Sequence, residues 1–144
     1  MTPYDDDWPT CVKTNATLRM FSDQVGPEAI SKKLNINPTE SFSKGESHGN
    51  RGLIRKLNGW LLNTEEAVDS KDTRRHIDWL LSKLSPRKIE LDELRSNGVE
   101  VDISCLWMST GQGGPLMSPQ QMAVLCQLDL EIWWDIYFDD EEQA

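Results

Sequence analysis

The sequence has few of the residues on which enzymes and metal centres depend. Its 144 residues include two histidines, His48 and His76, and three widely spaced cysteines with no CxxC pair. No Ser-His-Asp or Cys-His arrangement can be assembled from them. The glycine-rich stretch at 111–114 has neither the phosphate-binding nor the dinucleotide-binding spacing. We therefore expect no catalytic residues, no cofactor and no metal site, and we predict that the protein is not an enzyme.

Long apolar runs are also missing. No stretch of about 18 apolar residues occurs, which argues against a transmembrane helix. The acidic start, residues 1–8, lacks the basic and apolar segments of a secretory signal. Free cysteines without an export signal are typical of a reducing compartment, so we expect a cytoplasmic location. Cys105 and Cys126 fall in apolar patterns and are interpreted as core residues, whereas Cys11 lies in an expected loop.

Basic residues are outnumbered, at 15 against 24 acidic residues, which gives a net charge of −9. Seven of the 24 acids lie near the two ends, so 17 acids and 15 bases remain elsewhere. The seven are Asp5, Asp6, Asp7, Asp139, Asp140, Glu141 and Glu142. Such runs are either solvated tails that aid solubility or an electrostatic attraction for a basic partner. Both interpretations argue against nucleic acid, whose binding needs a basic surface.

Alternation of apolar and polar residues predicts strands at 16–21, 99–107 and 130–138. Residues 53–64 are interpreted as a strand pair or one bent strand, with Gly59 as a bulge candidate. The last two clean strands each carry five apolar side chains on one face. These are Val99, Val101, Ile103, Cys105 and Trp107, and then Leu130, Ile132, Trp134, Ile136 and Phe138.

Helices are expected between these strands. Pro27 opens the first, which closes at 35–38, and the i, i+3, i+4, i+7 spacing of Ile77, Leu80, Leu81 and Leu84 predicts a strong helix over 72–84. A short helix follows at 89–95, and Ser118 begins the last with a capping box. Residues 39–52 and 109–117 are expected to be loops.

These elements predict one domain of the α+β class. Alternation that leaves one face polar argues against a parallel sheet buried on both sides. We expect a two-layer sandwich, mainly an antiparallel sheet with helices on one face. The predicted boundaries are an acidic N-terminal lead at 1–14, the domain at 15–138 and an acidic C-terminal tail at 139–144.

The outward face of the last two strands carries the candidate binding residues. Its carboxylates are Glu100, Asp102, Glu131 and Asp135, interleaved with Trp133 and Tyr137. One interpretation is a solvated face in which Arg19 or lysines pair with these acids across the strands. The other is a protein-binding patch, because exposed large aromatics beside charges are typical of interfaces. A carboxylate metal site is the weakest interpretation, since it lacks a histidine and close ligand spacing.

Other residues receive plainer interpretations. His76 is expected at the surface or a boundary, and Trp60, Trp107 and Trp134 in the core. Trp8 and Trp133 lack an obvious reason for burial, and an exposed tryptophan can anchor a partner. A small basic patch is expected from Arg51, Arg55 and Lys56 with Arg74 and Arg75.

Several segments together resemble a family of small bacterial proteins classed as a domain of unknown function. They are SDQVGPE at 22–28 running into LNINP at 34–38, the Gly59-Trp60 strand, the helix at 76–84, and LDLEI at 128–132 through DIY at 135–137. The resemblance covers about residues 15–138. It implies one compact α+β domain with no established catalytic residue to carry over. It also implies a similarity to the small acidic partners found beside bacterial toxins.

The leading functional prediction is a protein-binding inhibitor, most concretely an immunity protein that occludes a basic toxin. Its partner-binding residues would be Trp133, Tyr137, Glu131, Asp135, Glu100 and Asp102. One alternative is a small enzyme or ligand-binding domain with a site near the 43–52 and 109–118 loops. Another is a structural or regulatory module that forms homodimers through the exposed sheet.

Overall fold

The structure is a computed structural model that describes residues 2–139. The strands are β1 (Cys11–Ser22), β2 (Glu40–Phe42), β3 (Ser47–His48), β4 (Leu53–Ile54), β5 (Asn58–Asn63), β6 (Glu100–Ser109) and β7 (Ile132–Phe138). The helices are α1 (Pro27–Leu34), α2 (Thr73–Leu84), α3 (Lys88–Ser96) and α4 (Pro119–Leu128), with a 3-10 turn, η1 (Ser85–Arg87), between α2 and α3. None of the helices in this range combines the length and the apolarity needed to cross a bilayer.

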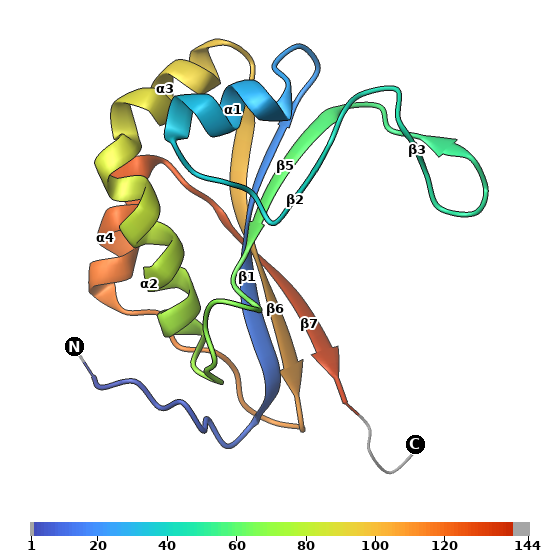
Figure 1. Ribbon diagram of the computed structural model, residues 1–144. Coiled ribbons are helices and arrows are strands. Elements are labelled where there is room, and N and C mark those ends of the chain that lie inside the picture. The colour runs from blue at the N-terminus through green and yellow to red at the C-terminus, as the bar shows by residue number, and fades with distance from the viewer. Residues whose placement is uncertain (1, 140–144) are drawn as a thin grey trace.

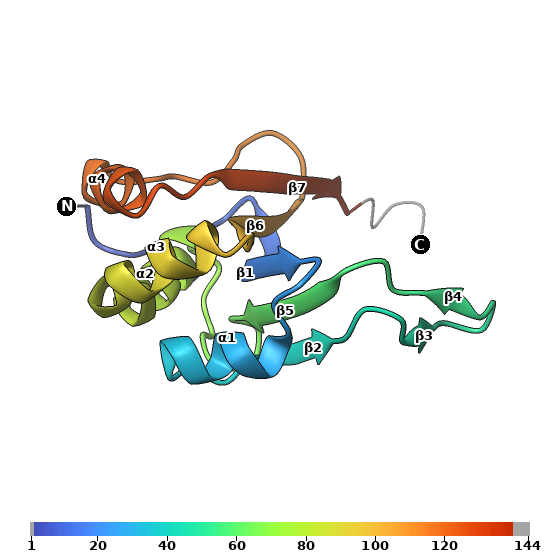
Figure 2. The ribbon, with the colours of Figure 1, turned by 90° about the horizontal axis from the view of Figure 1, so that it is seen from above.

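Five strands form one sheet in the order β2-β5-β1-β6-β7, and β3 pairs with β4 in a separate hairpin. All neighbours in the large sheet are antiparallel except β6 and β7, which run parallel. Figure 1 shows the helices gathered beside the sheet, and Figure 2 shows all four on the same side of it. The α+β class and the mainly antiparallel sheet are therefore confirmed.

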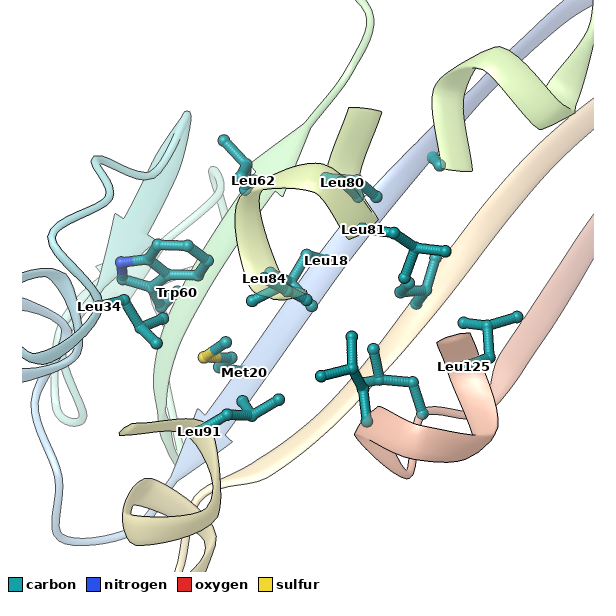
Figure 3. Packing of buried hydrophobic residues seen from close by; sticks show 14 of the residues in the cluster. Leu18, Met20, Leu34, Trp60, Leu62, Leu80, Leu81, Leu84, Leu91 and Leu125 are labelled. Carbon is teal, nitrogen blue, oxygen red and sulfur yellow. The ribbon is translucent and has the colours of Figure 1, made fainter. Parts of the chain in front are cut away.

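The core lies between the sheet and the helices. Alternate residues of β1 point toward the helices, and Leu18 and Met20 are opposite Ile103 and Val101 of β6. Leucines from α2, α3 and α4 pack onto this face, and Figure 3 labels Leu80, Leu81, Leu84, Leu91 and Leu125 among them. Because opposite residues of paired strands point to the same side, the period-two patterns of the sequence place one continuous apolar face against the helices.

Gly59 is required by packing and not by a bulge. The register of β5 is regular through this residue, which lies opposite Phe21 on one side and Phe42 on the other. The ring of Phe42 covers Gly59, and a Cβ atom there would come within 2.1 Å of the ring. The predicted bulge is therefore wrong, and the irregular register instead falls at residues 11–13 of β1. The expected loop at 39–52 also contains two short strands, β2 and β3.

The described part of the predicted acidic lead before β1 packs on α2. The strand begins at Cys11, and the carbonyl oxygens of Thr2 and Pro3 accept hydrogen bonds at 2.9 Å from the buried guanidinium of Arg74. Asp6 accepts from the Ser70 hydroxyl at 2.6 Å and pairs with Arg75. At least part of the N-terminal acidic run is thus used inside the fold. In the C-terminal run, Asp140, Glu141 and Glu142 lie outside the described residues.

Three further residue assignments differ from the sequence prediction. Cys126 was expected in the core but is exposed on α4, because α4 turns other residues toward the sheet. Cys11 was expected in a loop but is buried at the start of β1, and burial raises the pKa of its thiol to about 11. His76 was expected at the surface or a boundary but is buried, and its two ring nitrogens are hydrogen-bonded to Ser70 and Thr64.

The buried ion pair between Asp72 and Arg74 should contribute strongly to stability. Both side chains are almost fully inaccessible, and the pair is joined at 2.7 Å. Replacing Asp72 with alanine leaves a buried guanidinium unpaired, so we expect the free energy of unfolding to fall by about 3–5 kcal/mol. Asp92→Ala, which breaks exposed pairs with Lys88 and Arg95, is the matched control and should cost about 1 kcal/mol or less. Urea denaturation of both variants measures this, and equal losses would contradict the assignment.

His76 should make stability depend on pH near neutrality. Burial lowers the pKa of its imidazole below the usual 6.5, and Nε2 donates to the carbonyl of Ser70 at 2.8 Å, which fits the neutral ring. Below pH 6.5 the imidazole of His76 is therefore protonated in the unfolded chain but stays neutral in the folded chain. The free energy of unfolding consequently falls as the pH drops through this value. Urea titrations at pH 7.5 and pH 5.5 should show the loss, and His76→Gln should reduce it. Parallel pH profiles for the two proteins would contradict this account.

Candidate functional site

The face of the sheet opposite the helices is open and carries the carboxylates and aromatics that the sequence singled out. On β7, Trp133 and Tyr137 are 56% and 51% exposed. On β6, the neighbouring residues Ser104 and Met108 lie beside these two aromatics in the parallel register. No helix of residues 2–139 covers this side (Figure 2). The alternation of the sequence therefore does place the rings and acids on one water-facing surface.

Asp102 differs from the other acids on this face because an arginine balances its charge. Arg19 of β1 lies directly opposite it, and the guanidinium donates two hydrogen bonds to its carboxylate, at 2.7 and 2.8 Å. Both side chains are partly buried. The cross-strand pairing that the sequence offered as the plain alternative is thus present for this one acid. In the part of the chain that the structure describes, Glu100, Glu131 and Asp135 form no such pair.

Most of these side chains surround one shallow depression of about 480 Å³ at the start of β6 and β7. Three of the predicted acids and one predicted aromatic meet there, together with Asp129, which ends α4. Arg95 of α3 closes one side and donates to the carbonyl of Asp129 at 2.7 Å. The lining is Phe21, Arg95, Val99, Glu100, Val101, Asp102, Asp129, Glu131 and Trp133. A mainly acidic hollow whose lining includes two aromatic residues, Phe21 and Trp133, fits a cationic side chain.

Asp135 and Tyr137 lie farther along β7 and outside the depression. The hydroxyl of Tyr137 donates to the carboxylate of Asp135 at 3.2 Å, and this hydrogen bond raises the pKa of Tyr137. Both groups are in contact with solvent. The six predicted residues therefore divide into a hollow at one end of the face and a flat aromatic and acidic strip along β7.

Sequence analysis missed two exposed apolar residues of β7. Ile136 and Phe138 alternate with the residues of the open face and were expected to point inward, and they do point to the helix side. They are nevertheless 53% and 72% exposed, because the helices do not extend over this end of β7 (Figure 1). Alternation identifies the side of a strand to which a residue points but not how far the opposite layer reaches, so the sequence pattern gave no signal of this exposure.

The two loops of the alternative site, 43–52 and 109–118, leave opposite ends of the sheet. Phe42 leads into the first loop and is aligned with Phe21 at one end of β1, whereas Ser109 leads into the second and pairs with Cys11 at the other end. Ten residues of strand separate these ends by about 30 Å. No single pocket can therefore be lined by both loops.

The expected basic patch is also dispersed. Arg74 is buried against Asp72, and Arg75 pairs with Asp6 on α2. Arg55 instead lies over the ring of Phe42, 3.9 Å from its centre, at the base of the hairpin that projects away from the helices. Arg55 and the two arginines of α2 therefore lie far apart and do not form one basic patch.

A second cavity, of about 400 Å³, lies between the N-terminal segment and α2. Its polar groups already pair with one another: the hydroxyl of Tyr4 donates to Asp78, and Arg75 pairs with Asp6. Burial and this hydrogen bond raise the pKa of Tyr4 to about 12. Several of the polar groups that line this open hollow are therefore already engaged in contacts within the fold. Among residues 2–139, no group of three or more His, Cys, Asp or Glu side chains is placed to hold a metal ion.

Comparison with known proteins places the chain in a family without assigning an activity. Neither the curated proteins nor the solved structures include a significant match. The family match covers nearly the same range as the resemblance drawn from the sequence, and it confirms a domain-of-unknown-function family. Since it extends over residues 12–139, which is most of the chain, the protein belongs to the family described as Domain of unknown function (DUF4279).

Proposed function

We propose that this protein binds a basic protein through the open face of β6 and β7, and that it acts as an immunity-type inhibitor by covering its partner. The observation that carries the proposal is the exposure of Trp133 and Tyr137 beside acids on a face that no described helix covers. Buried in an interface, a tryptophan and a tyrosine supply the kind of anchor that dominates binding energy.

Charge supports a basic partner. The chain carries a net charge of −9, and Glu100, Glu131 and Asp135 on the face lack an intramolecular salt bridge within residues 2–139. These acids would attract a cationic surface at long range and speed its encounter. The neutralised Asp102 contributes to the rigidity of the face and less to attraction, so we rank it below the other three acids as a binding residue.

The face predicts which variants lose the partner. In affinity capture from cells of the natural source, we expect the wild-type chain to retain one basic protein, and Trp133→Ala with Glu131→Lys to reduce its recovery by about 30-fold or more, as loss of an interface anchor does. The matched control makes equivalent changes on the helix side, Ile89→Ala with Glu28→Lys, because Ile89 is exposed on α3 and Glu28 on α1. It should retain the partner.

The inhibitor role is tested with the captured protein. Expressed alone, it should arrest growth, and coexpression of the wild type or the control variant should restore growth, whereas the face variant should not. Equal recovery on the face variant, recovery of no protein, or a partner without a basic surface would each contradict the proposal.

A further inference from the structure

The outer edge of β7 is an unusual sheet edge. β7 is the last strand of the five-stranded sheet, spans seven residues and contains neither lysine nor proline. Proteins commonly protect such edges with those residues or with very short strands, because a free edge pairs readily with another strand. β2, at the opposite edge, has only three residues. Figure 1 shows β7 as the red strand at the margin of the sheet.

Backbone hydrogen bonds show which groups of β7 are free. The carbonyl of Glu131 accepts from Ile103 of β6, and the amide of Asp139 donates to Ser109, at 3.0 and 2.9 Å. In a parallel ladder the residues bonded to one neighbour alternate, so the odd-numbered residues face β6. The backbone groups of 132, 134, 136 and 138 therefore point to the free edge, where no hydrogen bond to residues 2–139 is formed.

The two sides of β7 differ in chemistry. On the open face its side chains are Trp133, Asp135 and Tyr137, preceded by Glu131. On the helix side they are Ile132, Trp134, Ile136 and Phe138, all apolar. A strand added to this edge would extend both rows. Lysine or arginine would suit the open face through Asp135 and the faces of the two rings, and aliphatic residues would suit the other side.

We propose that the free edge of β7 binds an extended segment of the partner in which cationic and aliphatic residues alternate, by adding it as a further strand. This inference rests on the proposed function, and it specifies which part of the partner binds: an extended segment that pairs with β7. Main-chain hydrogen bonds to the even-numbered residues would give affinity, and the two side-chain rows would give specificity.

A second copy of the chain is a poorer occupant of this edge. Asp135 is the central residue of β7, so a two-fold antiparallel pairing that uses the whole strand sets Asp135 opposite its own copy. Like charges directly opposite destabilise a strand pair. Each copy also carries a net charge of −9, and shifting the register to separate the two carboxylates shortens the ladder.

Peptide titration of the isotope-labelled full chain tests the proposal by NMR. The probe is VKVKVKV, and VVKKKVV is the control with the same composition and charge but no alternation. We expect saturable shifts of the backbone amides of Trp134, Ile136 and Phe138. Affinity for the control should be at least about tenfold lower, because it cannot place all its lysines on the open face and all its valines on the other side. Equal affinity for both peptides, or no saturable shift, would overturn strand addition.

A backbone variant separates strand addition from attraction by charge. Ile136→Pro removes an edge-facing amide without removing a donor to β6, and edge strands tolerate proline. It should weaken binding of VKVKVKV at least about tenfold, whereas Ile136→Val, which keeps both the amide and an aliphatic side chain in the apolar row, should weaken it far less. Retained binding by the proline variant, combined with loss in Asp135→Lys, would overturn the edge mode while leaving docking on the open face intact.

Two further measurements keep the test decisive. If Ile136→Pro fails to fold, two versions of VKVKVKV replace it, one N-methylated at its lysines and one at its valines. Only one of them should bind, because only alternate amides face β7. Sedimentation of the unliganded chain should show a monomer. A dimer that Ile136→Pro dissociates would mean that a second copy occupies the edge, and would overturn the choice of occupant.

Discussion

One-sided burial of the sheet is the constraint on which the rest of this structure depends. Alternate residues of β1, β5 and β6 form a single apolar surface, and the leucines of the helices have no other surface of that size to cover. Once all four helices lie there, the opposite face stays in water. The side chains of that face do not have to be apolar to fill the core. Their composition can therefore serve solubility, salt bridges between strands or the binding of a partner.

The open face shows more than one of these uses. Arg19 and Asp102 form a bidentate pair between β1 and β6, so one acid of the row has a partner within the fold. The aromatic rings of β7 and the acids near them have no comparable partner among residues 2–139. The unpaired groups of the face are concentrated on β7, where exposed rings, acids and a free backbone edge occur in one short segment.

The acidic character of the chain is likewise divided. Part of the N-terminal run serves the fold, because Asp6 pairs with Arg75 and the amide of Asp5 donates to Asp72 beside the buried Arg74. A charge run that appears free in a sequence can thus be a docked segment whose partners lie about 70 positions away. Removal of an acid there would test stability, whereas removal of an acid on β7 would test binding.

The sequence by itself determined the fold class, the main helices and the side of each clean strand, because periods of 2 and 3.6 residues report which side chains share a face. Trp133, Tyr137 and their neighbouring acids could be named from that information alone. Only the tertiary structure decided that β7 runs parallel to β6, that Ile136 and Phe138 are left uncovered, that Phe42 covers Gly59, and that His76 and Arg74 are buried. Those features depend on how far one layer extends over another and on contacts between distant segments, and local periodicity carries no information about either.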